Sequence, residues 1–134
     1  MGENRMSGAA KLSVALCVHN EATQLADCLE TLGFADEIVV VLDRCSDESK
    51  AVAEKSSART VEGAWPLEGP RRHAAIDLCS GDWILEVDAD ERASEALGRE
   101  IRQTIENAAP GYFLVPFDNY IGTRLVKYGW GGSW

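Results

Sequence analysis

Short apolar runs alternate, along most of the chain, with stretches whose apolar residues recur at helical spacing. The runs predict strands over residues 12–18, 37–42, 82–87 and 112–117, with a shorter one over 58–61. The spaced stretches predict helices over 21–32, within 43–56, over 71–81 and over 94–107. Helices between successive strands form βαβ units, so the pattern predicts an α/β fold with a mainly parallel sheet flanked by helices.

The expected ends of these elements follow from capping residues and helix breakers. Ser46 and Ser94 are suitable N-caps for the helices that follow them. Gly33 and Gly81 are expected to end the first and third helices, because glycine readily adopts the left-handed conformation found just past a helix. Gly and Pro residues mark 62–70 as a loop.

Polar residues stand directly after three of the predicted strands. They are His19, Asn20 and Glu21 after 12–18, Asp43 after 37–42, and Asp88, Asp90 and Glu91 after 82–87. In an open parallel sheet, ligands bind beyond the carboxyl ends of the strands, which lie along one edge. These residues, far apart in the sequence, are therefore expected to converge on one ligand site.

The stretch 88–91 has three carboxylates in four positions, at the end of a strand expected to be buried. Their mutual repulsion requires a positive partner. Asp88 and Asp90 project to one side of an extended chain, and their oxygens suit Mg²⁺ or Mn²⁺ bound together with a diphosphate. In the alternative interpretation both are turn residues, and Glu91 occupies the first turn of the next helix, where the helix dipole favours it.

Four further residues near this edge allow two interpretations each. Asp43 can accept hydrogen bonds from a base or a ribose, or it can form only an Asx-turn. Asp47 can contact the ligand, but it is expected instead to organise a helix N-terminus. Arg71 and Arg72 form a tight basic pair that can bind a phosphate, although an arginine on an exposed helical turn is usually only solvated.

Composition narrows the class of protein. With 134 residues, 46% hydrophobic and 26% charged, the chain is expected to form a single soluble domain. A formal net charge of −9 argues against a nucleic-acid partner, and no apolar stretch is long enough to form a transmembrane segment. Four cysteines without metal-ligand spacing are expected to be buried free thiols in a reducing cytosol. Residues 1–11 are expected to be a flexible leader.

Four segments together resemble the family 2 glycosyltransferases of the GT-A fold. They are LSVALCVHNEATQLADCLETL, ADEIVVVLDRCSDES, EGPRRHAAIDLCSGDWILEVDADER and GYFLVPFDNYIGTRLVKYGW. The nearest subgroup resembles bacterial lipopolysaccharide-core β-glucosyltransferase-like proteins. The resemblance runs from about Leu12 to the last residue, and its motifs occur in the family's order. It implies a Rossmann-like GT-A fold over 12–134, forming a partial nucleotide-sugar-binding domain.

The resemblance also implies roles for individual residues. The family's strand-end segment, which lines the nucleotide pocket, corresponds to Val18, His19, Asn20 and Glu21. Asp43 corresponds to the aspartate that reads the base, usually uracil, and Arg72 to a basic residue near the diphosphate. Asp88 and Asp90 correspond to the DxD pair that holds the ribose and the metal. Two positions depart from the family pattern: His73 replaces the usual Asn, and Arg44 stands where a small residue is typical.

The function implied by the resemblance is inverting, metal-dependent transfer of sugar from a UDP-sugar to a bacterial envelope saccharide. Family members continue beyond this length, and their general-base carboxylate lies downstream of the DxD pair. The chain is therefore expected to be a donor-binding half without the base, with self-association through the apolar run 130–134 (WGGSW). A non-catalytic nucleotide-binding or interaction module is the alternative. The expected location is cytoplasmic, including the inner face of the membrane.

Overall fold

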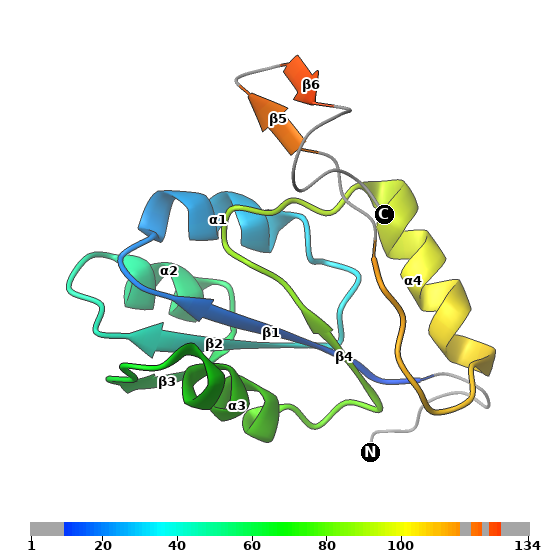
Figure 1. Cartoon of the computed structure of the whole chain (residues 1–134), viewed down its shortest axis with the longest axis horizontal. Coiled ribbons are helices and arrows are strands. Elements are labelled where there is room, and N and C mark those ends of the chain that lie inside the picture. Colours follow the sequence, from blue (N-terminus) through cyan, green and yellow to red (C-terminus); the bar gives the residue numbers. More distant parts are fainter. Residues whose placement is uncertain (1–9, 116–118, 122–123, 127–134) are drawn as a thin grey trace.

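A four-stranded parallel sheet with helices on both faces forms the body of the molecule (Figure 1). The computed structural model describes residues 10–115, 119–121 and 124–126. The strands of the sheet are β1 (Leu12–Val18), β2 (Glu37–Asp43), β3 (Arg59–Gly63) and β4 (Trp83–Glu86), in the order β3-β2-β1-β4. The helices are α1 (Ala22–Glu30), α2 (Ser49–Lys55), α3 (Glu68–Leu78) and α4 (Glu95–Asn107). This architecture confirms the predicted fold class.

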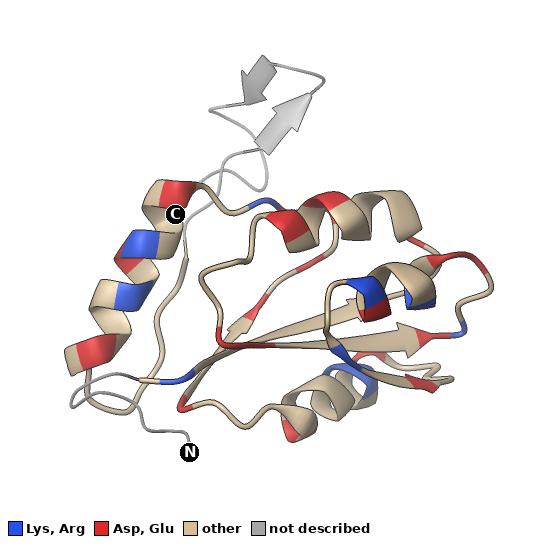
Figure 2. Ribbon diagram, turned by 180° about the vertical axis from the view of Figure 1, so that it is seen from behind, with Lys and Arg blue, Asp and Glu red and all other residues tan. Residues whose placement is uncertain are grey.

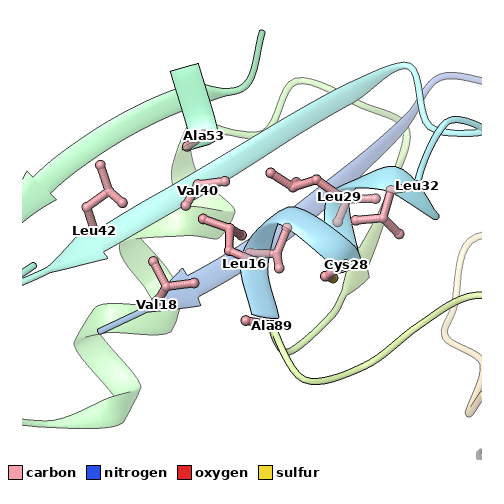
Figure 3. Packing of buried hydrophobic residues seen from close by; sticks show 11 residues of the cluster. Leu16, Val18, Cys28, Leu29, Leu32, Val40, Leu42, Ala53 and Ala89 are labelled. Carbon is pink, nitrogen blue, oxygen red and sulfur yellow. The ribbon is translucent and has the colours of Figure 1, made fainter. Parts of the chain in front are cut away.

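Two cores lie on opposite faces of the sheet, because successive side chains of a strand point to opposite faces. On one face, Leu16 of β1 and Val40 and Leu42 of β2 pack against α1 and α2 (Figure 3). On the other face, Val39 and Val41 pack against α3. Each fully buried Leu or Val contributes roughly 1.5–3 kcal/mol relative to an exposed one. The most buried part of the sheet therefore holds the carboxyl ends of β1 and β2 in place.

Helix α3 starts earlier than its sequence predicts and includes part of the predicted loop. It begins at Glu68 and ends at Leu78, whereas the prediction was 71–81. Pro70 fits inside its first turn, where the backbone N–H has no intrahelical partner to lose. Gly81 lies beyond the helix, and a Cβ there would stand 2.6 Å from Ser13 Oγ. Close approach to β1 requires this glycine, not a helix cap.

The two predicted N-caps have different outcomes. Ser94 caps α4 as predicted, since its Oγ accepts a hydrogen bond from Leu97 N at 3.0 Å. The prediction for Ser46 is wrong: α2 begins three residues later, with Glu48 as its N-cap. The carboxylate of Asp47 accepts a hydrogen bond from Ser49 N at 2.9 Å. Asp47 therefore provides the side-chain acceptor that was expected from Ser46.

Strand β4 forms an end of the sheet, and it is less buried than predicted. Ile84 is 37% exposed, and Trp83 is only partly buried. The prediction of a strand over 112–117 is wrong for residues 112–115, which form no regular structure. Tyr112 in this segment is 85% exposed. In this part of the chain Phe113 contacts Trp83 through its ring, with centroids 5.6 Å apart, and no backbone ladder forms. An apolar run becomes a strand only where a partner strand can pair with its backbone.

The remaining described strands, β5 (Asn119–Ile121) and β6 (Arg124–Val126), form a separate antiparallel pair. Residues 116–117 of the predicted strand, 1–9 of the predicted leader and 130–134 of the predicted self-association edge lie outside the described residues. Ala10 and Lys11 are described, and Lys11 N donates to Asp82 Oδ2 at 2.8 Å.

Within the described part of the chain, no helix is long and apolar enough to cross a membrane. All four cysteines are free thiols, as predicted, although only Cys28 is fully buried.

Candidate functional site

The carboxyl edge of the sheet gathers the loops that follow β1, β2 and β4. Acidic and basic residues follow each other directly where β2 ends (Figure 2). The parallel registers pair Val18 with Leu42 and Ala15 with Glu86, so the three strands end on the same side. The predicted convergence of residues from distant parts of the sequence therefore has a structural basis.

Asp43 ends β2 and is completely buried. Its Oδ1 accepts hydrogen bonds from Arg44 Nε at 2.9 Å and from Trp65 N at 3.0 Å. Its Oδ2 accepts hydrogen bonds from Arg44 Nη2 at 3.0 Å and from Arg71 Nη1 at 3.1 Å. The hydrogen bonds from Arg44 hold the pKa of Asp43 well below its usual range, against the opposing effect of burial. Asp43 is thus a buried anion neutralised by arginines.

A cavity of about 290 Å³ lies between α3 and the ends of β1 and β4. Arg71 and Arg72 line one side of it, and Asp88 and Glu91 line the other. The Nε atom of Arg71 is buried and has no hydrogen-bond partner among the described residues. Because Arg71 also binds Asp43, its guanidinium connects the end of β2 with this cavity.

Arg72, its neighbour on α3, is half exposed and already paired. Its Nη2 lies 3.0 Å from Glu68 Oε2, and its Nε lies 3.3 Å from Glu86 Oε1. Exposed pairs of this kind contribute little stability, up to about 1 kcal/mol. An anion of higher charge can therefore compete with the carboxylates for Arg72.

The acidic turn after β4 is anchored by Ala89. This side chain is 2% exposed and packs in the same core as α1 (Figure 3). Asp88 and Asp90, on either side of it, are exposed. Glu91 closes the turn, because its Oε1 accepts a hydrogen bond from Asp88 N at 2.8 Å. The alternative that placed Glu91 in the first turn of α4 is wrong, since that helix begins at Glu95.

The acidic turn does not form a complete metal cage. Among the described residues, no three His, Cys, Asp or Glu side chains are grouped so that they could hold a metal ion. Two exposed carboxylates with hard oxygen ligands nevertheless fit a cation such as Mg²⁺, which commonly takes one or two carboxylates and completes its shell with phosphates and water. The chemistry of the two carboxylates suits such a cation, and of the two only Asp88 lines the cavity.

His19 and Asn20 tie the loop after β1 to the end of β2. The Nδ1 of His19 lies 2.7 Å from the carbonyl oxygen of Asp43, so in a neutral ring Nδ1 carries the proton and donates it. Asn20 has a positive φ of 50°, which asparagine tolerates well, and its Oδ1 accepts from Ser46 N at 2.7 Å. Both side chains hold the loop backbone, and neither lines the cavity beside Asp88.

Val18 and Glu21 also serve the backbone of this edge. Val18 is buried in the core, so only its backbone faces the loop, where its carbonyl oxygen lies 3.5 Å from Cys45 Sγ. Glu21 Oε1 accepts a hydrogen bond from His19 N at 3.1 Å. Asp47 Oδ2 accepts from Ala22 N at 3.1 Å, and the other oxygen serves α2. The expectation that Asp47 organises a helix N-terminus is confirmed.

The sequence did not identify Arg44 as a partner of Asp43. Arg44 has a φ of 51°, and this left-handed backbone turns its side chain back onto the preceding residue. The available signal was the pair Asp43–Arg44 at the strand end, with an arginine where a small residue is typical of the resembled family. His73 is exposed on α3 and has no role in the cavity lining.

The sequence matches one protein-family model over most of its length. The model is described as Glycosyl transferase family 2, and it matches residues 13–128. An uncharacterized glycosyltransferase from Rickettsia conorii is 35% identical over 92 residues, which are 68% of this chain and 33% of that protein. The lipopolysaccharide core biosynthesis glycosyltransferase LpsC from Rhizobium meliloti is 28% identical over 125 residues, 87% of this chain and 42% of that protein. The chain thus spans less than half the length of these relatives.

Solved structures with the same fold support the GT-A assignment. A mannosyltransferase from Pyrobaculum calidifontis in complex with GDP-Man and Mn²⁺ has a TM-score of 0.60 at 18% identity, covering 70% of this chain and 32% of that one. Glucosyl-3-phosphoglycerate synthase from Mycobacterium tuberculosis in complex with Mn²⁺, UDP and glucosyl-3-phosphoglycerate has a TM-score of 0.54 at 21% identity, covering 62% and 36%. The likeness at these identities establishes the fold.

Proposed function

Because this chain belongs to glycosyl transferase family 2, we propose that the carboxyl edge of its sheet binds the nucleotide-sugar donor of a sugar transferase. The observation that carries the proposal is the position of Arg71. Its guanidinium contacts Asp43 at the end of β2 and also lines the cavity beside Asp88. A ligand with a base at one end and a diphosphate at the other fits this arrangement, which runs from Asp43 through Arg71 to the cavity.

In the proposed complex, the base lies at Asp43 and the diphosphate lies in the cavity. The proposed donor is a UDP-sugar, because Asp43 corresponds to the aspartate that usually reads uracil in the family that the sequence resembles. Arg71 and Arg72 face the cavity and offer charge-assisted hydrogen bonds to phosphate oxygens. Binding of the diphosphate requires Arg72 to leave Glu68 or Glu86, which are weak, half-exposed partners.

Asp88 and Asp90 would hold a divalent cation, Mn²⁺ or Mg²⁺, together with the diphosphate. Such a cation offsets the charge that develops on the departing nucleoside diphosphate. The buried Ala89 fixes the backbone between the two carboxylates, and both of their side chains are exposed. Glu91 bonds to Asp88 N and positions Asp88.

The other residues of the edge act as positioning residues in this proposal. His19, Asn20 and Glu21 hold the loop after β1 against the end of β2, and Val18 anchors that loop in the core. They form the wall on which the nucleoside rests. The acceptor is a saccharide of the bacterial envelope, a proposal that the similarity to LpsC supports. Transfer inverts the anomeric configuration, and no catalytic base is assigned to the described residues.

The proposal is tested by calorimetric titration of the chain with UDP, in the presence and absence of Mn²⁺. We expect binding that Mn²⁺ strengthens, and we expect Asp90→Asn to abolish the strengthening. Asp77→Asn is the matched control, because Asp77 is an exposed carboxylate on α3 outside the cavity lining. Equal response of Asp90→Asn and the parent to Mn²⁺ would show that the metal site is elsewhere. Absence of any UDP or GDP binding would contradict the donor site itself.

A further inference from the structure

The carboxylate of Asp43 has no free acceptor position in this structure. A carboxylate offers about four lone-pair positions for hydrogen bonds. Arg44 and Trp65 N occupy those of Oδ1, and Arg44 and Arg71 occupy those of Oδ2. A base that is to be read by Asp43 must therefore displace a donor that is already there.

Arg44 is the donor that can leave most easily. Its side chain is 54% exposed, whereas that of Arg71 is 24% exposed and lies in the cavity wall. The third donor, Trp65 N, belongs to the backbone, and the loop after β3 fixes its position. Because the Arg44 guanidinium can move out into solvent, whereas Arg71 is held in the cavity wall and Trp65 N in the backbone, the exchange of Arg44 for a ligand costs less than the exchange of either other donor.

Neutralisation of Asp43 does not need Arg44. Arg71 already supplies one cation to the carboxylate, at 3.1 Å and from a more buried position. Arg44 adds a second cation and does so from a left-handed backbone, with φ of 51°, which is unfavourable for a residue other than glycine. Its N–H donates to the carbonyl oxygen of Gly63 at 2.8 Å, which holds that backbone in place. The backbone of Arg44 is therefore held in an unfavourable conformation for a contact that charge balance does not require.

We propose that Arg44 is a latch on the base-reading carboxylate: its guanidinium occupies acceptor positions of Asp43. A base with an N–H donor must displace this guanidinium in order to bind. This inference rests on the proposed donor site. The latch lowers the affinity for the nucleotide and selects for bases that present an N–H group to Asp43. A base without such a donor gains nothing by displacing the guanidinium, so Arg44 stays on Asp43 and the ligand binds without the base contact.

The test compares the parent with Arg44→Ala and Arg44→Lys, by calorimetry with UDP and Mn²⁺. Lysine keeps the charge but cannot form the two-pronged contact of arginine. Both variants are expected to bind UDP more tightly, by at least about fivefold, because the two-pronged contact that the base displaces is worth no less than an exposed ion pair. Arg44→Gly, which suits a positive φ, replaces Arg44→Ala if thermal unfolding shows that the alanine variant is not folded.

Two control ligands separate release of the latch from a general effect of charge. The affinities for pyrophosphate and for N3-methyl-UDP, which lacks the N3–H donor, are expected to be the same in all folded variants. Tighter binding of N3-methyl-UDP by Arg44→Ala, or UDP affinity in that variant equal to or below that of the parent, would overturn the latch and leave the donor site standing. If no variant binds UDP or GDP, the donor site and the latch fall together.

Discussion

Strand β2 begins and ends with an acidic residue, and the two carboxylates have different kinds of partner. Glu37, at the amino end, accepts hydrogen bonds from Ser13 Oγ at 2.6 Å and Ser80 N at 2.8 Å, and it pairs with Arg59 at 2.9 Å. Asp43, at the carboxyl end, is held by two arginines and one backbone N–H. Both carboxylates are poorly exposed and hydrogen-bonded, but only that of Asp43 has mainly charged side chains as its partners.

The difference in partners separates a structural role from a binding role. The partners of Glu37 come from β1, from β3 and from the loop between α3 and β4, so this carboxylate joins three elements. Its Arg59 is tied further, to the carbonyl oxygen of Leu78 at 2.8 Å. By contrast, the arginines around Asp43 lie at the edge where the cavity opens, and one of them lines it. The amino end is expected to stabilise the fold and the carboxyl end to bind ligand.

The largest expected effect is on stability, from removal of the carboxylate at the amino end. Glu37→Ala is expected to lower the free energy of unfolding by about 3 kcal/mol, because Arg59, Ser13 and Ser80 lose their partner inside the structure. Urea unfolding followed by circular dichroism measures this loss. The control is Glu62→Ala, which removes an exposed pair with Lys50 and is expected to cost no more than about 1 kcal/mol. Equal losses in both variants would erase the distinction between a joining carboxylate and a surface one.

The next effect concerns pH. Burial acts to raise the pKa of Glu37, but hydrogen bonds from Ser13 and Ser80 and the pairing with Arg59 outweigh it and lower the pKa to about 2. A pKa lowered on folding gives stability that is present above the unfolded pKa and is lost as pH falls toward the folded one. Between pH 6 and pH 3, Glu37 therefore accounts for a loss of about 2 kcal/mol.

The variant Glu37→Gln isolates this pH dependence. Its free energy of unfolding is expected to fall by about 2 kcal/mol less than that of the parent over the same pH range, measured by urea unfolding at each pH. Asp43 contributes a dependence of the same sign in both proteins, since its pKa is also lowered. A parent and variant that lose equal stability would show that the carboxylate of Glu37 is not held as the structure places it.

A smaller effect, on affinity, is expected at the carboxyl end. Asp43→Ala is expected to weaken UDP binding about tenfold, or about 1.4 kcal/mol, in line with the value of a good contact to a base edge. The circular dichroism spectrum is expected to remain that of the parent. Calorimetry supplies the affinity, with Glu37→Ala as the comparison, because its folded fraction is expected to bind UDP as the parent does. Unchanged affinity in Asp43→Ala would remove that residue from the site.

The order of strands and helices could be predicted from the sequence, because the apolar residues that face the core recur along each element at the spacing of a strand or a helix. Apolar runs such as 12–18 and 37–42 gave β1 and β2 almost to the residue. Two kinds of boundary were not readable. The start of α3 depends on Pro70, which suits a loop and a first helical turn equally. The segment 112–115 needs a partner strand, which its own composition does not reveal.

The site was readable only in part, for a related physical reason. Parallel topology alone brings Asp43 and Asp88 to one edge, so their proximity to a common ligand site follows from the order of elements. The partners of each side chain depend on backbone angles that no periodicity encodes. The contacts of Arg44 with Asp43 and of His19 with the Asp43 carbonyl follow from loop conformations that are set by contacts distant in the sequence.

The measurement that tests the assignment of the two ends most directly is an NMR titration of the ¹⁵N-labelled chain with UDP and Mg²⁺. Backbone amide signals of Trp65, Asp88 and Glu91, at the carboxyl edge, are expected to shift as UDP is added. Those of Ser13, Ser80 and Gly81, at the amino end, are expected to remain unchanged. Shifts confined to the amino end, or an absence of shifts at Trp65 and Glu91 under saturating UDP, would contradict the donor site proposed here.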